Sequence, residues 1–401
     1  MKLFDERQNC CGCTACAQIC PRGAISLLPD SEGFLYPVVD SAVCIHCGLC
    51  RRVCAFQRDQ NSKNANVSAN LLKIFAVKHR NIAIRGESQS GGLFTLLSDP
   101  ILARGGVIYG AGFRPDWSVC HQRAETMGAR DALRGSKYVQ SQLDNTFQNV
   151  RADLLQKREV LFSGTPCQIA GLRSFLMMSQ VDMSRLLLCD LVCHGVPSPM
   201  VWRDYLAWRE QKMRKKIKRA VFRDSKRFGW HSGMGTILFA DDQLEETNIF
   251  SHLFYQRLIH RPACHACPHA TPQRVSDVTM ADFWGIERAH PDFVDNIGVS
   301  LALIHSDKGL QALSAAAERM EIIESDIESC RQSMLSKPSS QNPRSRQFWL
   351  DYQRGNFELI HRKYFIPHQW RMFVGKIVKR FPMSIHIKQR FLERKMLSGE
   401  K

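Results

Sequence analysis

The sequence predicts an α+β protein with a mixed α/β core between two regions of different composition. Three observations lead to this prediction. Eight of the nine cysteines before residue 55 fall into two runs, strand-like apolar segments alternate with helical stretches between residues 72 and 335, and basic and aromatic residues are frequent from 337 to 401. Strands that alternate with helices build layered α/β domains. We therefore expect four parts, at residues 1–57, 72–150, 155–335 and 337–401.

The two cysteine runs have identical spacing, Cys-x2-Cys-x2-Cys-x3-Cys. In the bacterial ferredoxin pattern for two [4Fe-4S] clusters, the fourth cysteine of each run ligates the other cluster. A disulfide framework would need an oxidising compartment, and a zinc ribbon would need only paired Cys-x2-Cys motifs. Residues 1–57 are therefore predicted to form a bacterial-ferredoxin-like domain. Its two clusters would be held by Cys10, Cys13, Cys16 and Cys54, and by Cys44, Cys47, Cys50 and Cys20.

Composition and charge limit the cellular setting and the partners. The chain opens without an apolar leader and has no apolar run near 18 residues, so we expect a cytoplasmic protein. Its net charge is +17, with six Lys or Arg among residues 212–219 and eleven against two Glu in 361–401. Such runs mark solvated helix faces or an anionic partner, such as an acidic redox protein, an anionic substrate or a membrane surface. No nucleic-acid motif accompanies the charge, so no nucleic-acid partner is expected.

The remaining elements follow from apolar runs and turn residues, taken in chain order. A hairpin is predicted around the turn at 29–33, and a polar linker at 57–70. Further strands are predicted at 73–78, 105–113, 160–163 and 186–192, and helices at 93–102, 168–178 and 200–218.

Further cysteines suggest a third cluster. Cys264-x2-Cys267 is a metal-type pair in a loop, whereas Cys167 and Cys193 each follow a predicted strand, where cofactor ligands converge in α/β layers. These four cysteines could hold a third [4Fe-4S] cluster. Alternatively, the pair binds zinc or nothing, and Cys167 and Cys193 are packing thiols. Cys189 would be the substitute ligand, and Cys11 is a spare cysteine beside the first run.

Two polar loops could bind a flavin nucleotide. Clusters pass single electrons whereas most organic substrates take two, and a flavin can do both. The first loop precedes a predicted helix and could cradle a phosphate, and the second adds a cation, an aromatic ring and hydroxyls. A helix cap and a charged surface loop would look similar. The residues concerned are Ser88, Ser90, Gly91 and Gly92 in the first loop, and Lys137, Tyr138, Gln140 and Ser141 in the second.

Read together, these motifs resemble those of the coenzyme F420 hydrogenase/dehydrogenase beta-subunit family. The resemblance rests on Gly-Thr-Pro-Cys at 164–167, Asp-Leu-Val-Cys-His-Gly at 190–195 and Asp-Phe-Trp-Gly at 282–285. It continues through the stretches at 88–94, 105–113, 135–141, 222–224, 229–230, 261–267 and 274–277. It implies an FAD-containing iron–sulfur oxidoreductase with a flavin-binding α/β core and a cluster in that core. FAD would lie along 88–92 and 137–141, and the two core domains would be the family's N-terminal-like and C-terminal-like domains.

The resemblance also suggests a reaction. An acidic ferredoxin would exchange electrons with the N-terminal clusters, and FAD would serve a small organic acceptor that is F420-like or linked to polysaccharide biosynthesis. Lys137, Asp190 and His194 are the candidate catalytic side chains, with Lys137 holding FAD phosphate or polarising its ring. The alternatives are a non-catalytic electron-transfer subunit of a larger complex, or a true coenzyme F420 reductase. The basic C-terminal tail could also contact a membrane surface.

Overall fold

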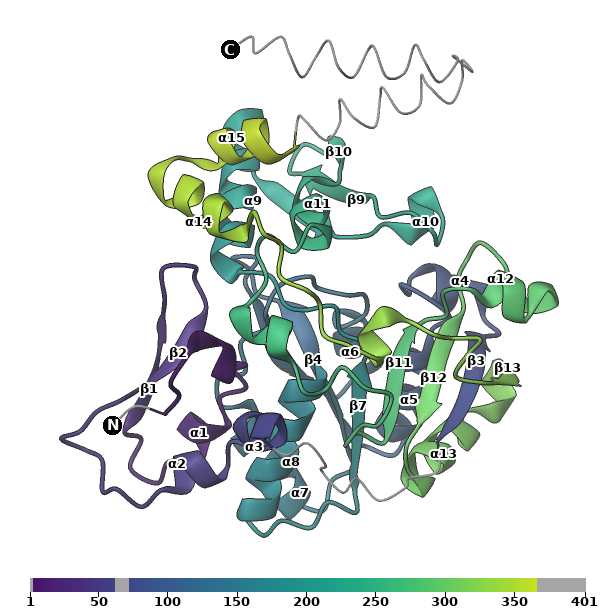
Figure 1. The fold of residues 1–401 in the computed structure, drawn as a ribbon. Coiled ribbons are helices and arrows are strands. Elements are labelled where there is room, and N and C mark those ends of the chain that lie inside the picture. The colour runs from purple at the N-terminus through teal and green to yellow at the C-terminus, as the bar shows by residue number, and fades with distance from the viewer. Residues whose placement is uncertain (1–2, 62–71, 366–401) are drawn as a thin grey trace. The chain divides into compact units, whose positions relative to one another are not determined.

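A computed structural model describes residues 3–61 and 72–365 of the chain (Figure 1). Two compact units are present, Met1–Ser345 and Arg346–Lys401. The N-terminal module, residues 1–57, therefore belongs to the same compact unit as the α/β core. Most of the predicted basic tail, from residue 366 onward, lies outside the described residues, and so does its predicted membrane contact.

An eight-stranded mixed sheet forms the centre of the first unit and confirms the predicted mixed α/β core. Its strand order is β13-β3-β12-β11-β7-β6-β4-β5. β4, β6, β7 and β11 run parallel to one another, and the strands on both flanks are antiparallel to their neighbours. The bounds are β3 Lys73–His79, β4 Val107–Phe113, β5 Val119–Ala124, β6 Val160–Ser163, β7 Leu186–Leu191, β11 Val278–Asp282, β12 Ser300–Ile304 and β13 Met320–Ser325.

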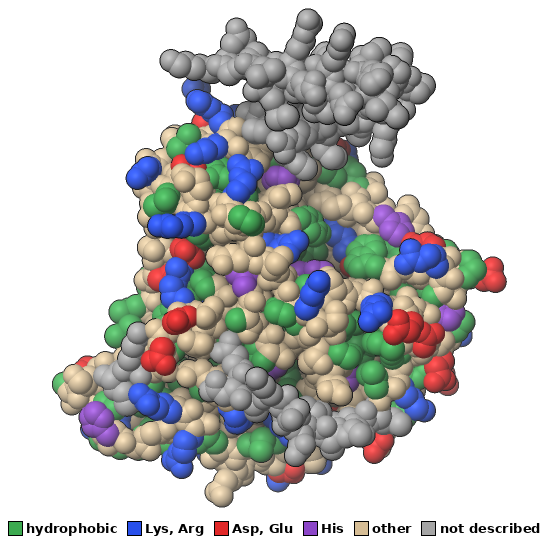
Figure 2. All heavy atoms as spheres, viewed as in Figure 1, with side chains coloured by type: hydrophobic (Ala, Val, Ile, Leu, Met, Phe, Trp, Pro, Cys, Tyr) green, Lys and Arg blue, Asp and Glu red, His purple; other side chains and the backbone are tan. Residues whose placement is uncertain are grey.

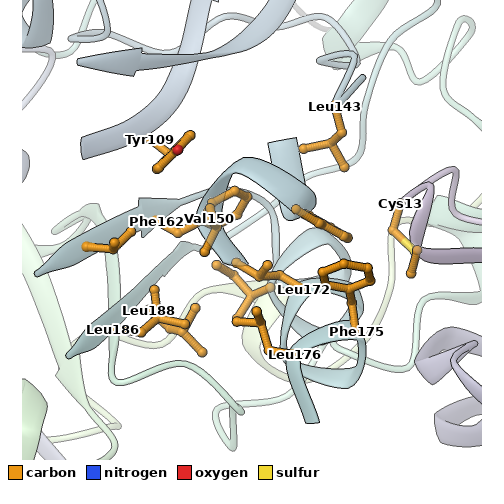
Figure 3. Packing of buried hydrophobic residues seen from close by; sticks show 14 of the residues in the cluster. Cys13, Tyr109, Leu143, Val150, Phe162, Leu172, Phe175, Leu176, Leu186 and Leu188 are labelled. Carbon is orange, nitrogen blue, oxygen red and sulfur yellow. The ribbon is translucent and has the colours of Figure 1, made fainter. Parts of the chain in front are cut away.

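Alternating side chains of the central strands bury both faces of this sheet. Leu161 and Leu187 pack against α5 (Leu93–Ala103) and α13 (Asp307–Ser314) on one face. On the other face, Phe162 and Leu188 pack against α7 (Thr146–Leu155) and α8 (Pro166–Met178). Figure 3 shows this second cluster, with the aliphatic and aromatic side chains of α8 between the strands and Cys13 of the N-terminal module.

The N-terminal module contains the predicted hairpin and packs directly on α8. β1 (Ile25–Pro29) and β2 (Leu35–Val39) pair antiparallel, and the short helices α1 (Ala15–Gln18), α2 (Leu49–Arg52) and α3 (Ala55–Asn61) complete it. A Cβ placed on Gly171 of α8 would lie 2.8 Å from Cys13 Sγ, so only glycine permits this approach. The Gln18 side chain accepts a hydrogen bond from the backbone N–H of Phe147 at the start of α7. The module is therefore held against two core helices.

A second, three-stranded sheet has the order β10-β9-β8 and packs with α9 (Pro199–Met213) and α11 (Ile249–Tyr255) around aromatic side chains. Its strands are β8 Ile217–Val221, β9 Gly235–Phe239 and β10 Leu244–Thr247. The prediction of one helix over 200–218 was wrong at its end. Arg214 adopts a left-handed conformation (φ 54°) and terminates α9, and the chain continues as β8. The basic run 212–219 is therefore divided among a helix end, a turn and a strand.

Short helices complete the first unit, and the described part of the second unit is helical. In the first unit these are α4 Ile82–Gly86, α6 Met127–Asp131, α10 Ser225–Phe228 and α12 Ile286–Ala289. The helices at the second unit are α14 Ser345–Arg354 and α15 Phe357–Ile360. None of the helices in the described ranges is both long enough and apolar enough to cross a bilayer.

Replacing Gly91 with alanine should destabilise the fold, because the added Cβ would lie 2.1 Å from the carbonyl oxygen of Val77 and 2.5 Å from the Ser300 nitrogen. Neither backbone atom can move without distorting β3 or β12. We expect a loss of about 2 kcal/mol or more, seen as a lower melting temperature. Gly86→Ala in α4 is the control, since its Cβ meets nothing within 4 Å. Equal melting temperatures for the two variants would contradict the explanation.

Candidate functional site

The structure divides the N-terminal cysteines into the two groups that the ferredoxin pattern predicts. Burial raises the pKa of Cys16, and its neighbours Cys13, Cys10 and Cys54 raise it further, which places these four thiols together. We call them the proximal cysteines. The distal cysteines, Cys20, Cys44, Cys47 and Cys50, line a small cavity of about 20 Å³. Each group thus takes its fourth cysteine from the other run, and among the distal cysteines Cys47 is exposed.

Four cysteines from separate places in the core line one further small cavity, of about 40 Å³. We call them the core cysteines. Cys167 lies in the first turn of α8, Cys193 follows β7, and the other two lie in and just after a short 3-10 helix, Pro262–Ala266. They are the four proposed from the sequence, namely Cys167, Cys193, Cys264 and Cys267.

A fifth cysteine, Cys11, borders the same cavity and was not predicted there. Hydrogen bonds with Cys13 and Cys167 are the main causes that raise the pKa of the buried Cys11 thiol, so its sulfur lies between a proximal and a core cysteine. Its only signal in the sequence is that it follows Cys10. Cys189, the predicted substitute ligand, instead packs in the hydrophobic cluster of α5 and α13 on the opposite face of the sheet.

Two buried nitrogens at the core cavity have no hydrogen-bond partner among the described residues. They are Nε2 of His269 and Nη1 of Arg274, and both residues line the cavity with the core cysteines. An unpaired buried donor costs about 1–3 kcal/mol, so a bound group that accepts hydrogen bonds would suit this cavity. Within residues 3–61 and 72–365, no three His, Cys, Asp or Glu side chains lie close enough to share a single metal ion. A [4Fe-4S] cluster makes a different demand, because each thiolate binds its own iron.

A larger cavity of about 430 Å³ lies where β6, β7 and β11 end. The carboxyl ends of parallel strands are the usual ligand-binding edge of an α/β sheet. Here Gly164 and Thr165 follow β6, Cys193 and His194 follow β7, and Trp284 follows β11. Cys193 and His194 also border the core-cysteine cavity, so the two cavities share a wall.

Most of the residues predicted to bind flavin line this large cavity. Those on the wall are Ser88, Ser90, Gly92, Lys137, Tyr138 and Ser141. Gly91 does not line it and is instead enclosed between β3 and β12. Gln140 also lies outside, where its side chain donates to the backbone oxygen of Cys11 and accepts from Arg261. The two loops thus meet at the large cavity, whereas Gly91 and Gln140 contact other parts of the fold instead of the cavity.

Lys137 and His121 give this part of the wall its electrostatic character. The Lys137 ammonium donates to the backbone oxygens of Ala132 (3.2 Å) and Arg134 (2.7 Å), and no carboxylate pairs with it within the described part of the chain. Burial lowers the pKa of Lys137 to about 7. Burial also lowers the pKa of His121 to about 4, so this ring is neutral where it contacts Ser141 Oγ (2.8 Å).

Another part of the wall is aromatic and ion-paired. The Arg223 guanidinium donates to Asp282 at 2.6 Å, and the indole of Trp230 donates to the same carboxylate at 2.7 Å. Trp284 stacks on Trp230 with ring centroids 5.0 Å apart. The ion pair and the stack hold Arg223 and Trp284 rigidly at the cavity, although Trp230 itself does not line it.

The three predicted catalytic residues are not equivalent in the structure. Lys137 and His194 line the large cavity, and burial lowers the pKa of His194. Asp190 does not line it: its side chain is 1% exposed and accepts a hydrogen bond from Thr279, with Arg274 3.8 Å away. Burial raises the pKa of Asp190 to about 6. Its place in the chain, three residues before Cys193, gives no indication that its side chain points into the interior.

Comparison with known proteins finds two matching family models. Residues 157–329 match the model that describes the C terminus of the beta subunit of coenzyme F420 hydrogenase/dehydrogenase, and residues 9–57 match a 4Fe-4S dicluster domain. Residues 157–329 therefore form a domain of the coenzyme F420 hydrogenase/dehydrogenase beta-subunit family. The two matches make this an iron–sulfur protein of the oxidoreductase type, and its N-terminal module is a dicluster domain.

A solved structure is also similar to this chain. It is the F420-reducing [NiFe] hydrogenase complex from Methanosarcina barkeri, with 16% identity over 71% of this chain and 94% of that chain, and a TM-score of 0.46. No curated protein matches the sequence.

Proposed function

We propose that the chain is an iron–sulfur flavoprotein oxidoreductase that passes electrons between a ferredoxin-type protein and a small organic acceptor. One observation carries the proposal: cysteine groups follow one another from the surface to the large cavity. The distal group includes the exposed Cys47, the proximal group is linked to the core group through Cys11, and Cys193 of the core group borders the large cavity. This is the order that stepwise electron transfer to a bound acceptor requires.

The core cysteines suit a third [4Fe-4S] cluster. Four thiols surround one cavity, which is the donor set of a cubane. His269 Nε2 and Arg274 Nη1 have no hydrogen-bond partner in the described part of the chain, although Asp190 lies 3.8 Å from Nη1, and both could donate to the sulfur atoms of the cubane. Such hydrogen bonds tune the potential of a cluster. Cys11 lies beside this set without being needed to complete it.

The large cavity suits FAD. Its volume falls within the range of about 300–1,000 Å³ that is typical of cofactor and ligand sites. The wall offers the hydroxyls of Ser88, Ser90 and Ser141, the start of α5 at Gly92, and the Lys137 ammonium, all of which suit a phosphate group. A bound flavin would supply the chemistry that clusters lack, because it exchanges single electrons with them and electron pairs with organic molecules.

The redox partner is expected to dock at the distal cysteines. Cys47 is exposed there, and so are the neighbouring basic side chains Arg22, Arg51 and Arg52 and the apolar Ile45. Figure 2 shows Lys and Arg side chains on the surface of the N-terminal module. An acidic ferredoxin would be attracted to such a surface, and its association would weaken as salt is added.

The acceptor would occupy the part of the large cavity next to the aromatic wall. Trp284, Tyr255 and the ion-paired Arg223 line this part of the cavity, a combination that suits a planar, anionic molecule such as a deazaflavin of the F420 type. A sugar-linked acceptor from polysaccharide biosynthesis is the alternative, and competition between the two classes for the purified protein would separate them. His194, which borders both cavities, is the side chain best placed to touch the acceptor.

Iron, acid-labile sulfide and flavin content of the anaerobically purified protein test the proposal. We expect about twelve irons and one FAD per chain, since three cubanes hold about four irons each. Cys193→Ala should lower the iron content by up to four, because Cys193 is a core cysteine. Cys189→Ala is the matched control and should lose none, since its thiol faces the other side of the sheet. About eight irons and no flavin in the native protein would favour a non-catalytic electron-transfer subunit.

Flavin binding should depend on pH through Lys137. Its pKa of about 7 in the free cavity would rise when a phosphate binds, because the anion favours the protonated amine. FAD affinity should therefore be highest below pH 7 and fall as the pH rises above 7, until the pKa of the complex is passed. Quenching of flavin fluorescence on titration of the deflavinated protein measures this affinity. Lys137→Met should bind FAD more weakly and without this pH dependence, and an unchanged profile would contradict the role.

A further inference from the structure

Arg261 is a fully buried cation without a carboxylate partner. Its relative exposure is 0%, and no Asp or Glu lies within ion-pair distance of it in the described ranges. Arg274, the other buried arginine at the core cavity, has Asp190 3.8 Å away. A buried charge is costly unless an opposite charge compensates it. The charge of Arg261 therefore needs an anion other than a carboxylate to compensate it.

The guanidinium joins the N-terminal module to the core. It donates to the backbone oxygens of Cys10 (2.8 Å) and Leu35 (3.0 Å) and to the side-chain oxygen of Gln140 (2.9 Å). It lies over the ring of Tyr36, 4.1 Å from the centroid. These groups satisfy its hydrogen bonds but offer only partial negative charge.

The same guanidinium lies next to two cysteine groups. Nη2 is 3.7 Å from the sulfur of Cys10, a proximal cysteine, and Arg261 also lines the cavity of the core cysteines.

We propose that Arg261 is the shared counter-ion of the proximal cluster and the core cluster, and that it raises the reduction potentials of both. The part that concerns the core cluster rests on the function proposed above, whereas the proximal part needs only the dicluster domain. A cubane with four thiolate ligands is anionic and gains one further negative charge when it accepts an electron from the ferredoxin-type donor. No bond is made or broken in this step. A fixed cation favours the reduced form, so its removal should lower both potentials.

The distal cluster provides an internal reference. Its cysteines line a separate cavity that Arg261 does not border, and Arg261 makes no contact with them. Arg261 would thus make the two inner clusters better electron acceptors than they would otherwise be. Electrons that enter at the exposed end would then be held next to the large cavity.

Two variants test this role in the full-length protein with its clusters in place. Arg261→Gln removes the charge, and Gln140→Glu neutralises it by placing a carboxylate oxygen where the amide oxygen now accepts from Nη1. Arg261→Lys keeps the charge. Gln148→Glu is the matched control, because Gln148 likewise donates to a backbone oxygen of the N-terminal module, that of Gln18, away from Arg261. Midpoint potentials are read cluster by cluster by electron paramagnetic resonance during redox titration, alongside the iron content.

We expect the proximal and core potentials to fall in Arg261→Gln and Gln140→Glu. A tenfold weaker reduction equilibrium corresponds to 59 mV for one electron. The distal potential should stay constant, and Arg261→Lys and Gln148→Glu should resemble the wild type. If Arg261→Gln fails to assemble its clusters, the proximal and core potentials of Gln140→Glu test the counter-ion role alone.

Three results would overturn the inference. The first is a protein with twelve irons in which the proximal and core potentials stay unchanged in Gln140→Glu and in any Arg261→Gln that assembles its clusters. This result would reject the counter-ion role and leave the proposed function intact. A fall of all three potentials, or the same fall in Gln148→Glu, would show a nonspecific effect. If the wild-type protein contains only eight irons, it has no core cluster. Arg261 could then not be shared between two clusters, and the proposed function would also be rejected.

Discussion

Helix α8 is the element on which the arrangement of both cavities and of the N-terminal module depends. It starts directly after β6, and a capping box fixes its first turn, in which Thr165 and Gln168 each bond the other's backbone. This turn supplies Gly164 and Thr165 to the wall of the large cavity and Cys167 to the core group. One turn further on, Gly171 receives Cys13 of the N-terminal module. A rigid helix thus sets the spacing between proximal and core cysteines, which a flexible linker could not do.

The interior around these cysteines is polar but carries few carboxylates. His121 stays neutral because of its burial, Lys137 pairs with backbone oxygens, and Arg261 relies on carbonyls, an amide and a ring. Such an environment favours negative charge that is brought in from outside, as phosphate groups or anionic clusters. Asp282 is the exception on the cavity wall, and it is already occupied by Arg223 and Trp230.

Local sequence patterns were sufficient for the cysteine groups and for most of the sheet. The fixed spacing of the two runs predicted which cysteines lie together, and the positions of Cys167 and Cys193 after strands predicted that they would meet the Cys264 pair. Contacts between distant parts of the chain were not predictable in this way. Arg261 and Cys10 are 251 positions apart, and Cys11 reaches the core cavity only because the module docks on α8. The end of α9 was missed because a left-handed Arg214 leaves no clear signal in a basic run.

The exposure of Cys47 makes the distal cysteines the most accessible of the three cysteine groups. Dissolved oxygen and chelators would meet the distal group first, because Cys11 and Cys13 are buried and pack against α8. Under the proposed function, damage in air would therefore begin at the distal group and would leave the large cavity intact. A protein with this layout would lose its distal cluster first and could still bind ligands in the large cavity.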